Sequence, residues 1–157
     1  MGGRWGLAAA KFCSAAWFGA AALFVIAGIR EVRSPELDSA ARDAVVLLRF
    51  PCYYVAGFGL VTISILGLVV SQMAGFRSRI GKVALILLVL SLTGMVADYV
   101  WVYMPLEEHI RTQGPRDARF TELHEASKWM NLANVSLCTL ASWLLCVAPT
   151  AISSSEK

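Results

Sequence analysis

The run FPCYYVAGFGLVTISILGLVVSQMAGF, residues 50–76, decides the fold class of this chain. It contains no charged side chain, and it is longer than the roughly 20 apolar residues that a helix needs to cross a bilayer. Two more windows, 12–29 and 129–152, are uncharged, and a third, 83–106, carries a single charge. These windows predict an all-α protein, a bundle of four transmembrane helices. We expect the helices at about 8–29, 51–74, 82–104 and 117–149.

The composition of the 157-residue chain agrees with this prediction. Hydrophobic residues make up 57%, charged residues 16%, and the mean hydropathy is +0.62, whereas soluble domains average roughly 45–50% apolar and about 25% charged residues. The net charge of +3 is small and no long basic run is present, so we expect no binding of nucleic acid. The four windows leave no room for a separate soluble domain, and residues 1–157 are predicted to form one integral membrane domain.

The first window is predicted to stay in the protein as a helix rather than to be removed as a signal peptide. Its apolar stretch is longer than the roughly 7–15 residues of a signal-peptide core. The sequence that follows, Ile29-Arg30-Glu31, offers no cleavage site of small residues.

The orientation in the membrane rests on the charges of one short connection. Four spans place both termini on the same side as residues 75–82. The segment Phe76-Arg77-Ser78-Arg79-Ile80-Gly81-Lys82 is basic and contains no acid. Positive charge in short loops marks the cytoplasmic side, although a raw count of basic residues slightly favours the opposite orientation. We therefore expect a protein of the cell (inner) membrane with both termini in the cytoplasm.

Polar side chains inside the apolar windows predict which helix faces meet. In the fourth helix they recur at steps of three or four residues, which places them on one face. The third helix carries a matching stripe, and the second has a small residue at every seventh position. The seam positions are His124, Ser127, Asn131, Asn134, Cys138 and Ser142 in the fourth helix, Ser91, Gly94 and Asp98 in the third, and Gly57, Ser64 and Ser71 in the second. In the first helix, Ala15, Gly19 and Ala22 are expected to allow close approach.

Two segments near the outer side also have helical patterns. The tripeptide Ser34-Pro35-Glu36 offers an N-cap, a proline at the first helical position and an acid in the first turn. The segment 35–48 is therefore predicted as a short amphipathic helix on the outer face of the membrane, with Pro51 beginning the next helix. Residues 117–149 would form about 50 Å of helix, so about three turns should project from the outer face or the helix should bend.

Asp98 is the one Asp, Glu, Lys or Arg inside the four windows, and we expect it near the outer interface. An ionised carboxylate within the membrane costs at least about 2.5–3.5 kcal/mol. Candidate partners on that side are Arg49, His124, Lys128 and Asn131. Two interpretations stay open, namely a structural ion pair or a carboxylate that reaches the headgroups, and a proton or cation site.

The same interface holds side chains of the types that ligate metals. Asp98, Glu108, His109 and His124 could supply oxygen and nitrogen ligands, but their spacing does not require a metal. No cofactor is expected, because the chain has no phosphate-binding glycine loop and only one of its two histidines, His124, is on a predicted spanning helix, whereas a membrane haem would need two. The chain also lacks the G-x-S-x-G motif of hydrolases. We also expect no enzymatic activity, since catalysis inside a membrane usually involves more ionisable groups than one Asp.

Several motifs resemble a known family. The fourth predicted helix contains Arg119-Phe120-x-x-Leu123-His124-x-x-Ser127-x-x-x-Asn131-Leu132, which looks like the fourth-helix signature of the transmembrane protein 205-like family. Phe50-Pro51-x-Tyr53-Tyr54 resembles that family's entry to its second helix, and Trp17-x-Gly19 resembles its first-helix region. The matches extend over nearly the whole chain in the same order. The resemblance implies a four-helix membrane domain of unknown function, with His124, Ser127 and Asn131 in the family pattern and Asp98 outside it.

The two larger motifs predict a small polar pocket at the outer end of the bundle. His124, Ser127 and Asn131 stand at i, i+3 and i+7 and therefore face one way, while Pro51 and Tyr53 or Tyr54 enter the membrane from the same side. The amphipathic segment would roof the pocket. Its predicted lining is Arg49, Tyr53, Asp98, His124, Ser127 and Asn131.

Three classes of function fit these features. The expected one is a structural or assembly subunit of a membrane complex, whose partners are the lipid bilayer and either other membrane helices or a second copy of the chain. The alternative is binding or transport of a small solute or cation through the polar pocket. A membrane enzyme or redox carrier is the least consistent with the residues present.

Overall fold

The computed structural model describes residues 2–75, 78–112 and 117–147, and over these residues the chain is helical, with short connections and no strand. Four helical segments are long and apolar enough to cross a membrane. The predicted all-α bundle of four transmembrane helices is therefore confirmed. The elements are α1 (Gly2–Arg33), α2 (Ser39–Met73), α3 (Arg79–Asp98), the π-helical turn η1 (Tyr99–Tyr103), α4 (Met104–Arg111) and α5 (Ala118–Val147).

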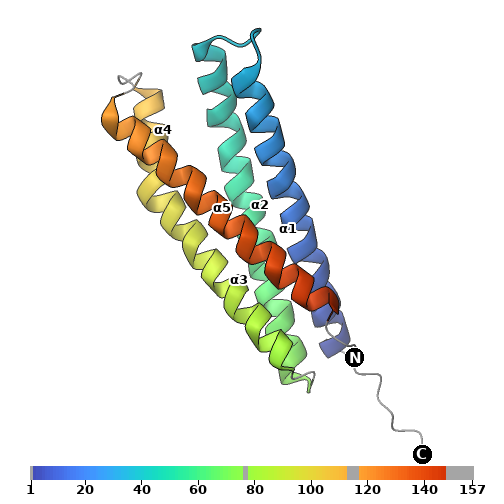
Figure 1. Cartoon of the computed structure of the whole chain (residues 1–157). Helices are drawn as coiled ribbons and strands as arrows, with labels where there is room; N and C mark the ends of the chain where they lie inside the picture. The colour runs from blue at the N-terminus through green and yellow to red at the C-terminus, as the bar shows by residue number, and fades with distance from the viewer. Residues whose placement is uncertain (1, 76–77, 113–116, 148–157) are drawn as a thin grey trace, which may run out of the picture.

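The helices form two antiparallel pairs that lie against each other (Figure 1). α1 packs along α2, α3 packs along α5, and α5 also crosses α1. We call the end that holds residues 30–49 and 104–124 the charged end. The opposite end, where α1 begins and α5 ends, is called the terminal end (Figure 1).

The spanning helices are longer than a bilayer requires. α2 has 35 residues and the continuous segment Arg79–Arg111 has 33, which correspond to about 50 Å of helix each at 1.5 Å per residue. The hydrocarbon core measures about 30 Å. The second and third spanning helices are therefore also long enough to project beyond the hydrocarbon core, as we expected for the fourth helix.

The start of α2 differs from the sequence prediction. Ser34 does not cap a helix, because the chain forms a turn there and the Ser34 hydroxyl accepts a hydrogen bond from the backbone N–H of Glu36 at 3.3 Å. The N-cap is Asp38, whose carboxylate accepts from the backbone N–H of Ala41 at 2.8 Å. The predicted amphipathic segment thus forms the first turns of α2 rather than a separate helix, and Pro51 lies inside α2.

The third spanning segment passes through a π-helical turn directly after Asp98. A π turn adds one residue to the local repeat and shifts the buried face of the helix. Asp98 and Tyr103 are five residues apart, yet both are buried on the bundle side. The turn therefore keeps Tyr103 on the bundle side, where its ring lies 4.9 Å from that of Tyr54, without breaking the helix.

The backbones of α1 and α2 approach each other closely near the terminal end. A Cβ built at Gly6 would lie 2.5 Å from the carbonyl oxygen of Gly67, and a Cβ built at Gly67 would lie 2.5 Å from the carbonyl oxygen of Gly6. Only glycine fits at both positions. The expectation that Gly19 mediates close approach inside the bundle is wrong, because Gly19 faces outward with no atom within 4 Å of its Cβ position.

Candidate functional site

Eight aromatic rings pack around the middle of the charged-end half of the bundle, and we call them the aromatic cluster. Its members are Trp17, Phe24, Phe50, Tyr53, Tyr54, Phe58, Tyr99 and Tyr103. The ring centroids of Phe24 and Tyr53 are 4.2 Å apart, and those of Tyr54 and Tyr103 are 4.9 Å apart. Such tilted and edge contacts are favourable for aromatic pairs, so the cluster joins α1, α2 and the third spanning segment.

Asp98 lies against this cluster and is bonded by a tyrosine. The Tyr54 hydroxyl donates a hydrogen bond of 2.7 Å to Oδ2 of Asp98. Asp98 is 0% exposed and Tyr54 is 1% exposed. Within the described residues, Oδ1 of Asp98 has no hydrogen-bond partner, and no ion pair involves this carboxylate. The partners expected from the sequence were therefore wrong, because Tyr54 comes closer from the neighbouring helix.

Three of the predicted pocket residues are brought together by a second set of bonds. The Tyr53 hydroxyl donates to Oδ1 of Asn131 at 2.9 Å. The Asn131 amide in turn donates to the backbone carbonyl of Ser127 at 2.9 Å and to its hydroxyl at 3.2 Å. This set joins α2 to α5. It adjoins the Asp98 bond, since the rings of Tyr53 and Tyr54 are 5.5 Å apart.

Arg49 takes a different direction from the one predicted. It forms an ion pair with Glu31 of α1, and its guanidinium lies over the ring of Phe24 at 4.3 Å from the centroid. This cation–π contact and the ion pair hold the Arg49 side chain against α1. Arg49 therefore closes the charged end of the α1–α2 pair rather than facing Asp98.

His124 is on the same face of α5 as Ser127 but lies in its exposed first turns. Its ring is stacked on Phe120, with 6.2 Å between the centroids, and Phe120 is also 5.3 Å from the ring of His109. The six predicted residues thus divide into a buried group and two side chains nearer the surface. A crevice of about 10 Å³ lies beside the cluster, and none of the six lines it.

The predicted metal ligands do not form a group. Among residues 2–75, 78–112 and 117–147, no three His, Cys, Asp or Glu side chains are placed to hold an ion. Asp98 and His109 belong to one continuous helix, and eleven residues separate them by about 16 Å along its axis. One metal ion cannot bridge that distance.

The seam between α3 and α5 follows the predicted stripe. The Ser91 hydroxyl lies 3.2 Å from the sulfur of Cys138 and donates to the backbone carbonyl of Asn134 at 3.4 Å. Gly94 leaves room for Asn134, whose Oδ1 would be 2.6 Å from a Cβ built on that glycine. In α2 one member of the stripe bonds within its own helix, because the Ser64 hydroxyl donates to the backbone carbonyl of Leu60.

Sequence reasoning missed Tyr54 as the partner of Asp98 and Trp17 as a fully buried ring. A signal for Tyr54 was present, since it stands three residues before Gly57 on the face that continues through Ser64. A side chain at position 57 would have no room, because Trp17 and Met95 occupy the space beside Gly57. A tyrosine on the same helix face as a row of small residues could therefore have indicated that Tyr54 is buried against a neighbouring helix.

Comparisons with known proteins found no relative of this chain. No family model matches the chain, and no curated protein or solved structure is similar to it. The chemistry of the site follows from its geometry. The Tyr54–Asp98 pair holds one hydrogen bond and leaves one buried carboxyl oxygen able to accept another donor.

Proposed function

We propose that this protein is a structural or assembly subunit of a membrane complex, without catalytic activity of its own. The observation that supports this proposal is that polar side chains of the seam bond to side chains of neighbouring helices within the bundle. Tyr53 bonds Asn131 and Tyr54 bonds Asp98, so these side chains join helices. A solute-binding pocket would instead direct such groups into an open space of a few hundred Å³.

The seam supports a scaffold because it sets the positions of the helices. Side-chain hydrogen bonds between membrane helices contribute roughly 0.6–2 kcal/mol each. The described bonds connect α2 with α3, α2 with α5, and α3 with α5. The outer faces of the helices are consequently held in one arrangement, which a partner can recognise.

The outer face of α1 is the proposed contact for that partner. Ala15 and Gly19 are exposed and one turn apart, and open space surrounds the Cβ position of Gly19. Small residues at this spacing let the backbones of two membrane helices approach closely. We propose that this face receives a helix of another membrane protein or of a second copy of the chain.

A photo-crosslinker at Phe12 tests the contact, because Phe12 is exposed on the same face as Ala15 and Gly19. Benzoylphenylalanine at this position should give a discrete protein adduct in native membranes, and the additional change Gly19→Leu should remove it. The matched control carries the crosslinker at Trp101, an exposed aromatic position of η1. The proposal is overturned if Phe12 gives no protein adduct, or if Gly19→Leu leaves the adduct unchanged. Two differently tagged copies distinguish a second copy from another protein.

One observation favours a second candidate function, the binding or passage of a proton or small cation at Asp98. Its Oδ1 is buried without a partner in the described residues, and so is the indole N–H of Trp17 in the aromatic cluster. Ionisable residues inside membrane segments often mark ion or proton pathways. An uptake assay in liposomes tests this candidate. Flux lost in Asp98→Asn and retained in Asn131→Ala would support it, and no flux above that of empty liposomes would contradict it.

We also propose that the terminal end faces the cytoplasm of a cell membrane, and that the chain is related to the transmembrane protein 205-like family. The basic, acid-free connection supports the orientation. Reaction of an impermeant thiol reagent with a cysteine introduced at Arg79, compared with a cysteine introduced at Glu36 of the charged end, tests it in intact cells. Labelling at position 79 without permeabilisation would reverse the orientation.

A further inference from the structure

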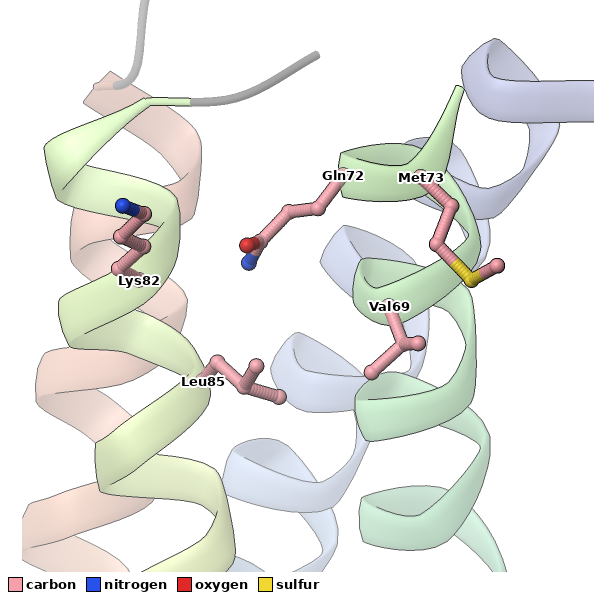
Figure 2. A pocket seen from close by; sticks show the side chains of 5 residues that line it. All are labelled: Val69, Gln72, Met73, Lys82 and Leu85. Atoms are coloured by element: carbon pink, nitrogen blue, oxygen red, sulfur yellow. The ribbon is translucent and has the colours of Figure 1, made fainter. Parts of the chain in front are cut away.

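An open cleft of about 300 Å³ lies between α2 and α3 at the terminal end (Figure 2). Val69, Gln72 and Met73 of α2 form one wall, and Lys82 and Leu85 of α3 form the other. In Figure 2, Gln72 extends across the gap toward α3, and Leu85 extends across it toward Val69. None of these residues belongs to the polar seam.

The cleft has a polar mouth and an apolar depth. Lys82, Gln72 and Met73 lie nearest the end of the bundle, whereas Leu85 and Val69 lie about one turn deeper on their helices. The Gln72 amide donates to the backbone carbonyl of Gly81 at 3.3 Å, which holds the mouth in shape. Polarity therefore changes from charged to apolar along the direction in which a lipid lies in a membrane.

The charge around the mouth has one sign. Arg79 is exposed one turn before Lys82, and Arg4 lies in the first turn of α1, which begins at the same end. The described residues of this end include no Asp or Glu; along the chain the nearest described acids are Glu31 and Asp98. An anionic group at the mouth therefore meets a basic side chain and, among the described residues, no acidic one.

We propose that the cleft between α2 and α3 binds one anionic phospholipid, with its phosphate at Lys82 and an acyl chain against Val69 and Leu85. Basic pockets between transmembrane helices are suited to acidic headgroups. A cleft of this volume is too small for a partner helix, which is about 10–12 Å across with its side chains. A lipid here is independent of the function proposed above, because the cleft and the seam share no residue.

Native mass spectrometry of the purified full chain tests this site with two lipids in equal amounts, dioleoyl phosphatidylglycerol and dioleoyl phosphatidylcholine. We expect one retained phosphatidylglycerol and little phosphatidylcholine. Lys82→Gln should weaken phosphatidylglycerol binding about fivefold, the loss expected for one basic side chain near an anionic surface. Arg4→Gln is the matched control, since it removes a charge from the same end without touching the cleft.

A second variant tests the apolar depth of the site. Val69→Trp should fill the cleft and displace the lipid while Lys82 is retained. Inorganic phosphate added in excess should leave the lipid bound, because phosphate lacks the acyl chain. The proposal fails if both lipids bind equally, if Lys82→Gln matches Arg4→Gln, if Val69→Trp retains the lipid, or if phosphate displaces it.

Discussion

The Tyr54 hydroxyl and Oδ2 of Asp98 are 2.7 Å apart and join α2 to α3 where neither residue meets solvent. The bond lies where two helix irregularities adjoin, since Pro51 is one turn before Tyr54 and η1 follows Asp98. A proline inside a helix removes one backbone hydrogen bond, and a π turn weakens regular pairing locally. The side-chain bond therefore stabilises the part of the bundle in which the backbone is least regular.

Tyr54→Phe should lower the free energy of unfolding by about 1–3 kcal/mol, because it leaves the buried carboxyl group of Asp98 without its donor. The measurement is the unfolding midpoint of the purified protein in one detergent. Tyr99→Phe is the control, since Tyr99 belongs to the same aromatic cluster and packs on Tyr54 at 5.0 Å. Equal losses in the two variants would show that the Tyr54 bond contributes nothing.

Asp98→Asn and Asp98→Ala should differ in stability. The asparagine keeps an oxygen that accepts from Tyr54 and removes the ionisable group, so its midpoint should stay at or above that of the wild type. The alanine leaves the tyrosine hydroxyl buried and unpaired, at a cost of about 1–3 kcal/mol. A large loss in both variants would mean that the charge of Asp98, rather than its hydrogen bond, stabilises the bundle.

Asn131→Ala should destabilise the α2–α5 contact by about 1 kcal/mol, since it removes the acceptor of Tyr53 and the bonds to Ser127. Ser136→Ala on the same helix is the matched control. The Ser136 hydroxyl is exposed and bonds only the backbone carbonyl of Leu132 in its own helix, so its loss should change stability by less than about 0.5 kcal/mol. The expectation is refuted if the two variants unfold at the same midpoint.

Gly67→Ala should destabilise the protein by about 1–3 kcal/mol, because the added methyl group would overlap the carbonyl oxygen of Gly6 and push α1 away from α2. Gly59→Ala, in the same helix, meets no atom within 4 Å and should be neutral or favourable by up to about 1 kcal/mol through helix propensity. Comparable midpoints for both variants would contradict the close approach of the two backbones.

The sequence was sufficient for the helices because long uncharged windows have few alternatives in a membrane. It was less informative at the start of α2, where Ser34 and Asp38 both offer a cap and the choice depends on how Pro35 turns the chain. It also failed for Gly19, since a small residue suits an inner and an outer helix face equally well.

The site was predicted in part for a related reason. Helical periodicity placed Ser127 and Asn131 on one face, and the order of the predicted spans placed Tyr53 at the same end of the bundle. Periodicity within one helix does not say how a neighbouring helix is rotated, however, and a rotation of one residue decides whether Tyr53 or Tyr54 meets Asp98. Arg49 was misplaced because an acid and an aromatic ring on α1 lie closer to it than the seam does.

The mutual fit of Gly6 and Gly67 also bears on how the protein is made. α1 and α2 follow each other directly, and at Gly6 and Gly67 the atoms nearest to each glycine belong to the backbone of the other helix. Chains emerge from the ribosome N-terminus first, and domains generally fold in that order. The first two helices can therefore assemble into a finished hairpin inside the bilayer while the rest is still being synthesised, and α3 with α5 then docks onto a surface that already exists.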